Sequence, residues 1–450
     1  MTLLAATQDL SGWGRHPRLT CQVYRPERRA DVGQLLASPG AGTWIGRGLG
    51  RSYGDAALNA EGAVMVTTRL DRMLAFDEDT GVLVCEAGVS LAVIIETFLP
   101  RGWFLAVTPG TRFVTVGGAI AHDVHGKNHH GEGSFAGCTR GFTLQTPGGE
   151  VLECAPDRNA EVYWATLGGA GLTGVVLLAA IQLRRVETAW MRVDELRAPD
   201  LDAALACMTE LDHRYTYAVA WIDVLARGRA MGRSVLMHGE HLPAAEAAGL
   251  RAPAPGGLPT LHVPCDAPAG LLNRLSVAAF NQAFWWAHPT RSGLRIPLES
   301  YFYPLDRLGG WNRLYGPRGF IQYQVLFPPA QAQAGLTAVL ERLSRDGAPS
   351  FLAVLKRMGP ATPGPLSFPA PGFTLALDLP WHPETAGLVA QLDAITLHHG
   401  GRLYLAKDAT AHPDTIAAMY PRLEEFRRLR ARLDPRGRLS STLARRVGLL

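Results

Sequence analysis

The chain has 450 residues, of which 47% are hydrophobic and 19% charged, so it is a folded globular protein long enough for two domains. Lysine and arginine total 44 against 40 acidic residues, and the net charge of +4 is too small to indicate a nucleic-acid partner. The six cysteines form no CxxC pair, and the N-terminus lacks a basic-then-apolar leader, so we expect reduced thiols and a cytoplasmic location. The longest apolar run, 175–181, is too short to span a bilayer, so any membrane contact is expected at the membrane surface.

Residues 20–185 are predicted to alternate strands with short helices. Ser90 can cap a helix over 91–99 that Pro100 ends. A further helix is predicted over 160–167. Strands are predicted at 64–66, 82–85 and 174–183, the last of them long and buried.

The composition changes after residue 190. A Pro/Gly-rich stretch over 252–269 indicates a loop, and residues 413–433 are predicted to be helical. The region between predicts an antiparallel sheet covered by helices. Its expected helices are 331–345 and 386–399, and its expected strands are 320–327, 350–356 and 373–379.

Two glycine-rich stretches indicate a binding site. The first, 46–55, places four glycines among two arginines and a serine; the second, 109–121, contains Pro-Gly-Thr and Thr-Val-Gly-Gly-Ala-Ile-Ala. Glycine lets a backbone approach a ligand closely, and the N–H groups of such loops bind anions. Two such loops suit a ligand with two phosphates and a long body. The alternative for the first loop is an ordinary glycine-rich β-turn.

A third glycine cluster, 169–174, matches G-x-G-x-x-G in the wrong context. The predicted strand follows these glycines, whereas a dinucleotide-binding turn requires strand, glycines and then helix. We interpret it as a tight turn beside a cofactor. The sequence contains neither a P-loop motif nor G-x-S-x-G, which disfavours a nucleotide kinase and an α/β-hydrolase.

Several histidines follow the second loop between residues 122 and 130. A metal site is one interpretation, but the glycines among them make a regular helical display improbable and no H-E-x-x-H pattern exists. For His129 and His130 we favour a structural role in satisfying buried backbone groups. For His125 and Lys127 we favour a role in function.

Taken together, these motifs resemble the vanillyl-alcohol-oxidase type of FAD enzymes, and within it the branch that oxidises a polyprenyl-phosphoryl ribose. The matching motifs lie in the same order along nearly the whole chain, at 48–55, 109–112, 115–121, 125–130, 171–174, 311–313, 322–324, 366–369 and 401–408. The resemblance implies an α+β, two-domain fold of the PCMH type. Residues 1–189 would form the FAD-binding domain, residues 190–401 a substrate domain, and residues 402–450 a segment returning to the FAD domain.

The resemblance also implies which residues hold the cofactor. Many relatives attach FAD covalently through a histidine in the first loop, and this chain has Tyr53 at that place, so the FAD is expected to be noncovalent. The implied cofactor-binding residues are Gly46, Arg47, Gly48, Leu49, Gly50, Arg51, Ser52, Tyr53, Gly54, Asp55, Ala56, Gly110, Thr115, Val116, Gly117, Gly118, His122, Asp123, Val124, His125, Val176 and Tyr404.

The implied reaction oxidises a secondary alcohol of a sugar, with a hydride leaving carbon for the flavin and a proton leaving to a base. Lys407 is expected to position or polarise the hydroxyl, and either Lys407 or His125 is the base. The remaining implied roles are hydrogen bonding by Tyr404, Gln322 and Gln324, phosphate binding by Lys127 and Lys356, and a pocket wall at Trp221.

The resemblance also implies substrate-binding roles for Phe302, Thr374 and Ala376, and these three positions depart from the family pattern, which has tyrosine, asparagine and cysteine there. The expected substrate is a polyprenyl-phosphoryl sugar or another polyol, and a separate short-chain dehydrogenase/reductase would complete an epimerisation. The alternatives are a soluble sugar-alcohol or aldonolactone oxidase that uses oxygen, and a flavin-less binding protein that keeps the fold.

Overall fold

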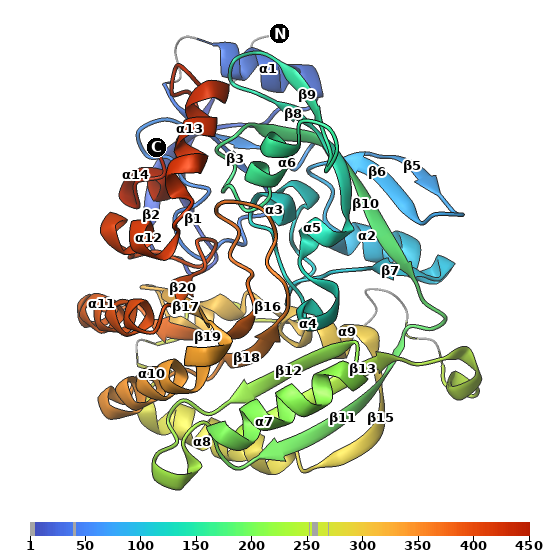
Figure 1. Ribbon diagram of the computed structural model, residues 1–450, viewed down its shortest axis with the longest axis vertical. Coiled ribbons are helices and arrows are strands. Elements are labelled where there is room, and N and C mark those ends of the chain that lie inside the picture. Colours follow the sequence, from blue (N-terminus) through green and yellow to red (C-terminus); the bar gives the residue numbers. More distant parts are fainter. Residues whose placement is uncertain (1–4, 39–41, 252, 254–259, 269) are drawn as a thin grey trace.

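The computed structural model describes residues 5–38, 42–251, 253, 260–268 and 270–450. Two sheets form its upper part (Figure 1). The first has the order β1 (Ala6–Ser11), β2 (Arg18–Tyr24), β4 (Ala63–Val66) and β3 (Trp44–Arg47). The second has the order β5 (Met73–Asp77), β6 (Val82–Glu86), β10 (Val175–Arg185), β8 (Thr139–Gln145) and β9 (Val151–Cys154), and β7 (Trp103–Leu105) also pairs with β10.

An eight-stranded antiparallel sheet forms the lower part (Figure 1). Its order is β15 (Arg291–Pro297), β11 (Trp190–Ala198), β13 (Ser234–His241), β12 (Tyr217–Ile222), β18 (Ala353–Met358), β19 (Gly372–Pro380), β17 (Phe320–Phe327) and β20 (Arg402–Leu403). We keep the division into 1–189, 190–401 and 402–450 as a proposal. The distribution of strands supports it, and β20 crosses the last boundary by pairing with β17.

Fourteen α-helices among the described residues surround these sheets. They are α1 (Arg29–Ala37), α2 (Leu91–Phe98), α3 (Val116–Ala121), α4 (His129–Glu132), α5 (Phe135–Cys138), α6 (Ala160–Thr166), α7 (Leu201–Leu211), α8 (Arg274–Ala287), α9 (Leu298–Phe302), α10 (Ala332–Asp346), α11 (Pro383–His398), α12 (Pro413–Met419), α13 (Leu423–Leu433) and α14 (Thr442–Arg446). A short pair of strands, β14 (Leu261–His262) and β16 (Leu308–Gly309), lies apart from the large sheets.

The large sheet has two different faces because side chains alternate along a strand. Ala220, Tyr323, Val325, Leu355 and Leu375 are buried in the main core. The other face of the sheet carries polar side chains. Cross-strand register places Gln322 opposite Asp378, Gln324 opposite Ala376, and Trp221 opposite Val354 on that face.

Most of the predicted elements are confirmed, with two corrections. The predicted helix over 413–433 is two helices, because Pro421 lacks a backbone N–H and disfavours helical backbone at Tyr420. The strand predicted at 350–356 begins only at Ala353. Ser350 instead uses its hydroxyl to accept from the Asp378 backbone N–H at 3.1 Å. In the loop predicted over 252–269, residues 252, 254–259 and 269 lie outside the described residues.

Candidate active site

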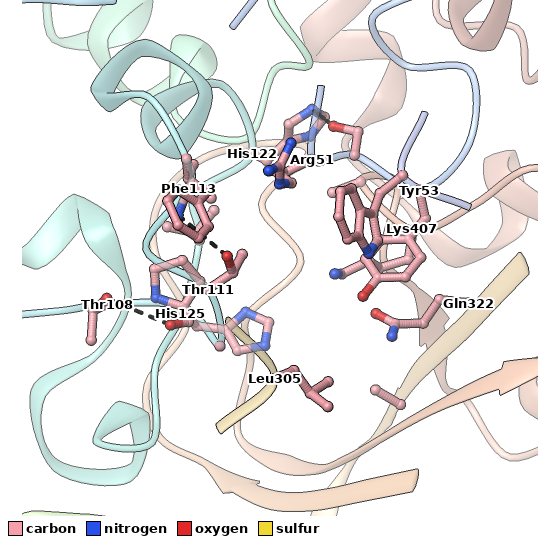
Figure 2. A pocket seen from close by; sticks show the side chains of 18 of the residues that line it. Arg51, Tyr53, Thr108, Thr111, Phe113, His122, His125, Leu305, Gln322 and Lys407 are labelled. Carbon is pink, nitrogen blue, oxygen red and sulfur yellow. Dashed lines mark hydrogen bonds between the residues drawn. The ribbon is translucent and has the colours of Figure 1, made fainter. Parts of the chain in front are cut away.

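A cavity of about 690 Å³ lies between the polar face of the large sheet and the two glycine loops. That volume falls within the range of small-molecule sites. Figure 2 shows Lys407, Tyr53 and Gln322 grouped at one side of the view, with Thr108, Phe113 and His125 at the other. The predicted residues that line it are Gly46, Arg47, Gly48, Leu49, Gly50, Arg51, Ser52, Tyr53, Ala56, Gly110, Thr115, Gly117, Gly118, His122, Val124, His125, Lys127, Val176, Trp221, Phe302, Gln322, Gln324, Lys356, Ala376, Tyr404 and Lys407.

The first glycine loop is tightly folded where it leaves β3. Gly50 adopts a φ of +66°, which L side chains rarely adopt. A Cβ on Gly48 would lie 2.2 Å from Thr115 Oγ1, so the two loops meet at this contact. Arg47 donates to the Ser11 carbonyl at 2.7 Å and to the Ala57 carbonyl at 3.3 Å. Its guanidinium therefore helps to shape the loop.

The second loop feeds the N-terminus of α3. Thr115 begins this helix, because its Oγ1 accepts from the Gly118 backbone N–H at 3.2 Å. Apart from the chain neighbours, no described residue lies within 4 Å of a Cβ built on Gly46 or Gly110, and both glycines line the cavity. A side chain at either position would therefore project into the cavity. The two loops and the open cavity beside their glycines suit an extended diphosphate cofactor such as FAD.

Five predicted contact residues lie behind the lining. A Cβ on Gly54 would meet the Asp408 carbonyl at 2.0 Å, and Val116 belongs to the core. Asp55 forms an ion pair with Arg446 at 2.7 Å. The Asp123 carboxylate accepts from the Ser367 hydroxyl at 2.6 Å and from the Ala136 backbone N–H at 3.0 Å. These side chains hold the loops in place.

Thr374, the fifth predicted residue behind the cavity lining, contacts the side chain of Gln324, which lines the cavity. Its hydroxyl donates to the Val325 carbonyl at 2.7 Å and accepts from the Gln324 side-chain amide at 3.2 Å. The same amide nitrogen lies 3.1 Å from Nε2 of His125. Because an amide nitrogen only donates, this nitrogen of His125 accepts. Nδ1 of His125 is buried and has no hydrogen-bond partner among the described residues.

Lys407 lines the same cavity as His125, and its charge adds to the effect of burial in lowering the pKa of His125. Its Nζ is 3.9 Å from the centre of the Tyr53 ring, and no ion pair or hydrogen bond to this nitrogen occurs within the described ranges. Burial lowers the pKa of Lys407 to about 7, with Asp378 acting to raise the pKa and Lys356 to lower it. A lysine with such a pKa can hold or release a proton near neutrality.

Lys127 and Lys356 complete a cationic group around the cavity. Burial lowers the pKa of Lys127 to about 7, with a further lowering from Lys356, and burial lowers the pKa of Lys356 to about 8. The Lys127 ammonium donates to the Tyr301 carbonyl. Three amines sharing one cavity favour an anionic ligand, whose charge would offset their mutual repulsion.

The whole chain contains only these three lysines, against 41 arginines, and all three line the cavity. Arginine remains charged at any physiological pH, whereas lysine can become neutral. This simple count is a signal in the sequence that our residue-by-residue analysis missed.

Tyr404, His129 and His130 use their polar side-chain atoms to bond backbone groups of the protein. The Tyr404 hydroxyl donates to the His122 carbonyl at 2.7 Å, so its ring faces the cavity while its hydroxyl fixes the second loop. His129 Nδ1 accepts from the Gly359 backbone N–H at 2.9 Å, and His130 Nε2 lies 2.9 Å from the Tyr215 carbonyl. Among the described residues no cluster of metal-ligating side chains is present.

An aromatic wall extends the cavity away from the glycine loops. Trp221 on β12 contacts Phe284 on α8, with ring centres 4.6 Å apart. Phe302 packs against Phe104 at 5.2 Å. Helix α8 was not among the predicted elements, although its 14 residues carry no charged side chain after Arg274. The lining residues that sequence reasoning missed include Trp13, Phe280, Phe284, Leu305, Asp306, Phe351 and Leu352.

Comparison with known proteins agrees with this architecture. A family model described as "FAD binding domain" matches residues 22–155, and one described as "D-arabinono-1,4-lactone oxidase" matches residues 379–447. The fold, the two loops and these matches define an FAD-dependent oxidoreductase with a PCMH-type cofactor domain.

Whole-chain similarity gives the family. The chain is 38% identical to decaprenylphosphoryl-β-D-ribose oxidase of Mycolicibacterium smegmatis, over 99% of this chain and 98% of that protein. It is 31% identical to bovine L-gulonolactone oxidase over 30% of each chain. The chain belongs to the decaprenylphosphoryl-β-D-ribose oxidase family.

Proposed function

We propose that this protein oxidises the C2′ hydroxyl of a polyprenyl-phosphoryl-β-D-ribose to the 2-keto intermediate of an epimerisation to arabinose. The observation that carries this proposal is the composition of the cavity, which joins the cofactor loops, three lysines and an aromatic wall. These features suit, in turn, a flavin, a phosphorylated sugar and a prenyl chain. When bound, FAD supplies the hydride acceptor.

The residues of the chain manage the proton and the position of the sugar. We assign the base to Lys407, whose amine has no competing partner among the described side chains and whose pKa is about 7. Nε2 of His125 is already engaged by Gln324. Burial, with a contribution from Lys356, lowers the pKa of His125 well below 6.5 and makes it a poor proton acceptor at neutral pH. Gln322 and Gln324 orient the sugar, and Lys127 and Lys356 bind its phosphate.

FAD is proposed to bind without a covalent link. The cavity presents Tyr53 on the first loop, and the Tyr53 phenol has a raised pKa, chiefly because of burial, which keeps it protonated. Acid precipitation of the purified protein should release all of the flavin into the supernatant. Flavin retained in the pellet would contradict this assignment.

A soluble sugar-alcohol or aldonolactone oxidase is the second candidate. It is favoured by the lactone-oxidase family model, whose match over 379–447 contains both Tyr404 and Lys407. Anaerobic flavin reduction separates the two. A prenyl-phosphoryl ribose should bleach the flavin if the first proposal holds, and xylitol or an aldonolactone should bleach it if the second does. A colourless protein that cannot be reconstituted with FAD would instead support a flavin-less binding protein.

Two partners follow from the proposed chemistry. The keto product must be reduced to complete an epimerisation, so we propose a separate short-chain dehydrogenase/reductase as the next enzyme. The substrate is a membrane lipid, so we also propose peripheral contact with a membrane. No helix within the described ranges has the length and hydrophobicity of a bilayer-spanning segment.

A further inference from the structure

Helix α8 presents an exposed face without a charged side chain. From Leu275 to Thr290 the sequence has no aspartate, glutamate, lysine or arginine. Leu275 is 82% exposed and Trp286 is 70% exposed. Leu275, Ala279, Ala283 and Trp286 are all exposed and recur at helical spacing, so their side chains share one face of the helix. Soluble helices normally place polar residues on such a face, and an exposed apolar one indicates a partner surface.

The opposite face of α8 is firmly anchored. The Asn281 side-chain amide donates to Asp223 Oδ1 at 2.7 Å, and Phe284 packs against Trp221. At the C-terminal end, Arg197 donates to the carbonyls of Trp286 and His288 at 3.3 Å and 3.0 Å. The outward face is therefore held in place as a fixed feature of the fold. Figure 1 shows α8 at the lower end of the molecule, remote from α12, α13 and α14.

The stretch of chain that contains α8 carries more positive than negative charges. Between residues 261 and 297 the chain has three arginines, Arg274, Arg291 and Arg295, and one acidic residue, Asp266. Asp266 is already paired with Arg15 at 2.7 Å, and Arg291 is paired with Glu195. Arg274 and Arg295 are exposed and form no ion pair with any described residue. An apolar helix face with tryptophan and flanking arginines has the chemistry of an interfacial helix on an anionic bilayer.

The same helix also forms part of the cavity. Phe280 and Phe284 line the cavity from α8, and Phe280 is still 43% exposed, so it lies at the cavity rim. The apolar lining is thus continuous with the exposed face. A prenyl chain could pass from a bilayer beneath α8 into the cavity without crossing water.

We propose that the exposed face of α8, centred on Leu275 and Trp286, docks the protein on an anionic membrane surface and so presents the cavity to its lipid substrate. The second part of this inference rests on the proposed function, whereas the docking itself does not. The proposal assigns the face to a bilayer and not to a second copy of the chain.

Vesicle co-sedimentation of the flavin-containing protein, without substrate, tests the docking. Wild type should bind vesicles of phosphatidylcholine and phosphatidylglycerol, and bind pure phosphatidylcholine at least tenfold more weakly. A Leu275→Ser/Trp286→Ser double variant should lose binding to the anionic vesicles by at least tenfold. The matched control is Leu74→Ser/Val151→Ser, which removes two other exposed apolar side chains, 45% and 55% exposed, and should bind like wild type.

Three results would overturn the proposal. They are absence of vesicle binding by wild type, equal binding by the Leu275→Ser/Trp286→Ser variant, and a wild-type dimer in sedimentation velocity that this variant dissociates. Flavin reduction by a short-chain, water-soluble prenyl-phosphoryl ribose should be the same in wild type and variant. Loss of that reaction in wild type would instead count against the proposed function, so the two failures are distinguishable.

Discussion

The Gln322 side-chain amide donates to the buried carboxylate of Asp378 at 2.6 Å, across two neighbouring strands of the large sheet. Asp378 also accepts from the Tyr315 hydroxyl at 3.2 Å. Its carboxylate is therefore held in a fixed position close enough to Lys407 to raise that residue's pKa. Burial in turn raises the pKa of Asp378 to about 7. The proton affinity of the proposed base is set partly by a residue that does not line the cavity.

This relationship predicts a shift in the pH profile. A neutral Lys407 is needed to accept a proton, so the rate of anaerobic flavin reduction should rise as the pH passes about 7. Asp378→Asn removes a negative charge that favours the protonated amine, so the pKa of Lys407 should fall and the rising limb should move to lower pH. Ser350→Ala removes the hydroxyl's hydrogen bonds to the Asp378 backbone N–H and the Leu352 carbonyl but no charge, so it is the control and should leave the profile in place. A rising limb that Asp378→Asn leaves unmoved would argue against this coupling.

Removal of Lys407 should stop reduction while leaving the cofactor in place. Lys407→Ala is expected to slow flavin reduction by about 10²–10⁴-fold, the usual contribution of a positioned acid or base. The visible spectrum should still show bound flavin, because the loops at 46–55 and 109–118 are intact. Lys407→Arg keeps the charge but cannot become neutral, so it should be equally slow. Full activity in the arginine variant would show that a fixed positive charge is sufficient.

Lys127 and Lys356 should contribute to the binding of a phosphorylated substrate but not to that of the same sugar without phosphate. Lys356→Ala is expected to raise KM for a prenyl-phosphoryl ribose by about tenfold, equivalent to about 1.4 kcal/mol of lost binding. KM for the same sugar without phosphate, a matched control, should change by much less. An equal loss for both substrates would assign Lys356 to the sugar or to the framework.

The contact between the two loops should make Gly48 essential for cofactor binding. A Cβ there would lie 2.2 Å from Thr115 Oγ1, which also caps α3, so Gly48→Ala must displace one loop or the other. We expect loss of FAD on gel filtration and a lower Tm. Gly131→Ala is the matched control, since no described residue outside its own helix and chain neighbours lies within 4 Å of the added Cβ. Retention of FAD by Gly48→Ala would show that the loops can separate without harm.

The two glycine loops of the proposed cofactor site could be recognised in the sequence because each is a local motif. In the structure the loops at 46–55 and 109–118 meet through Gly48 and Thr115. Local pattern could not predict the Asp378–Gln322 pair, because it depends on the register between strands that are 56 positions apart. Helix α8 escaped prediction for another reason, since its sequence lacks the polar face that normally marks a surface helix.

The placement of the three lysines has a practical consequence for chemical modification. Arginine supplies every other basic side chain apart from histidine, so the only side-chain amines in this sequence that acylating reagents find lie in the cavity. A lysine with a pKa of about 7 is largely unprotonated at pH 8, which makes Lys127 and Lys407 strong nucleophiles there. An activated ester or an aldehyde probe should therefore label the cavity in preference to the outer surface, and a phosphorylated ligand should protect it.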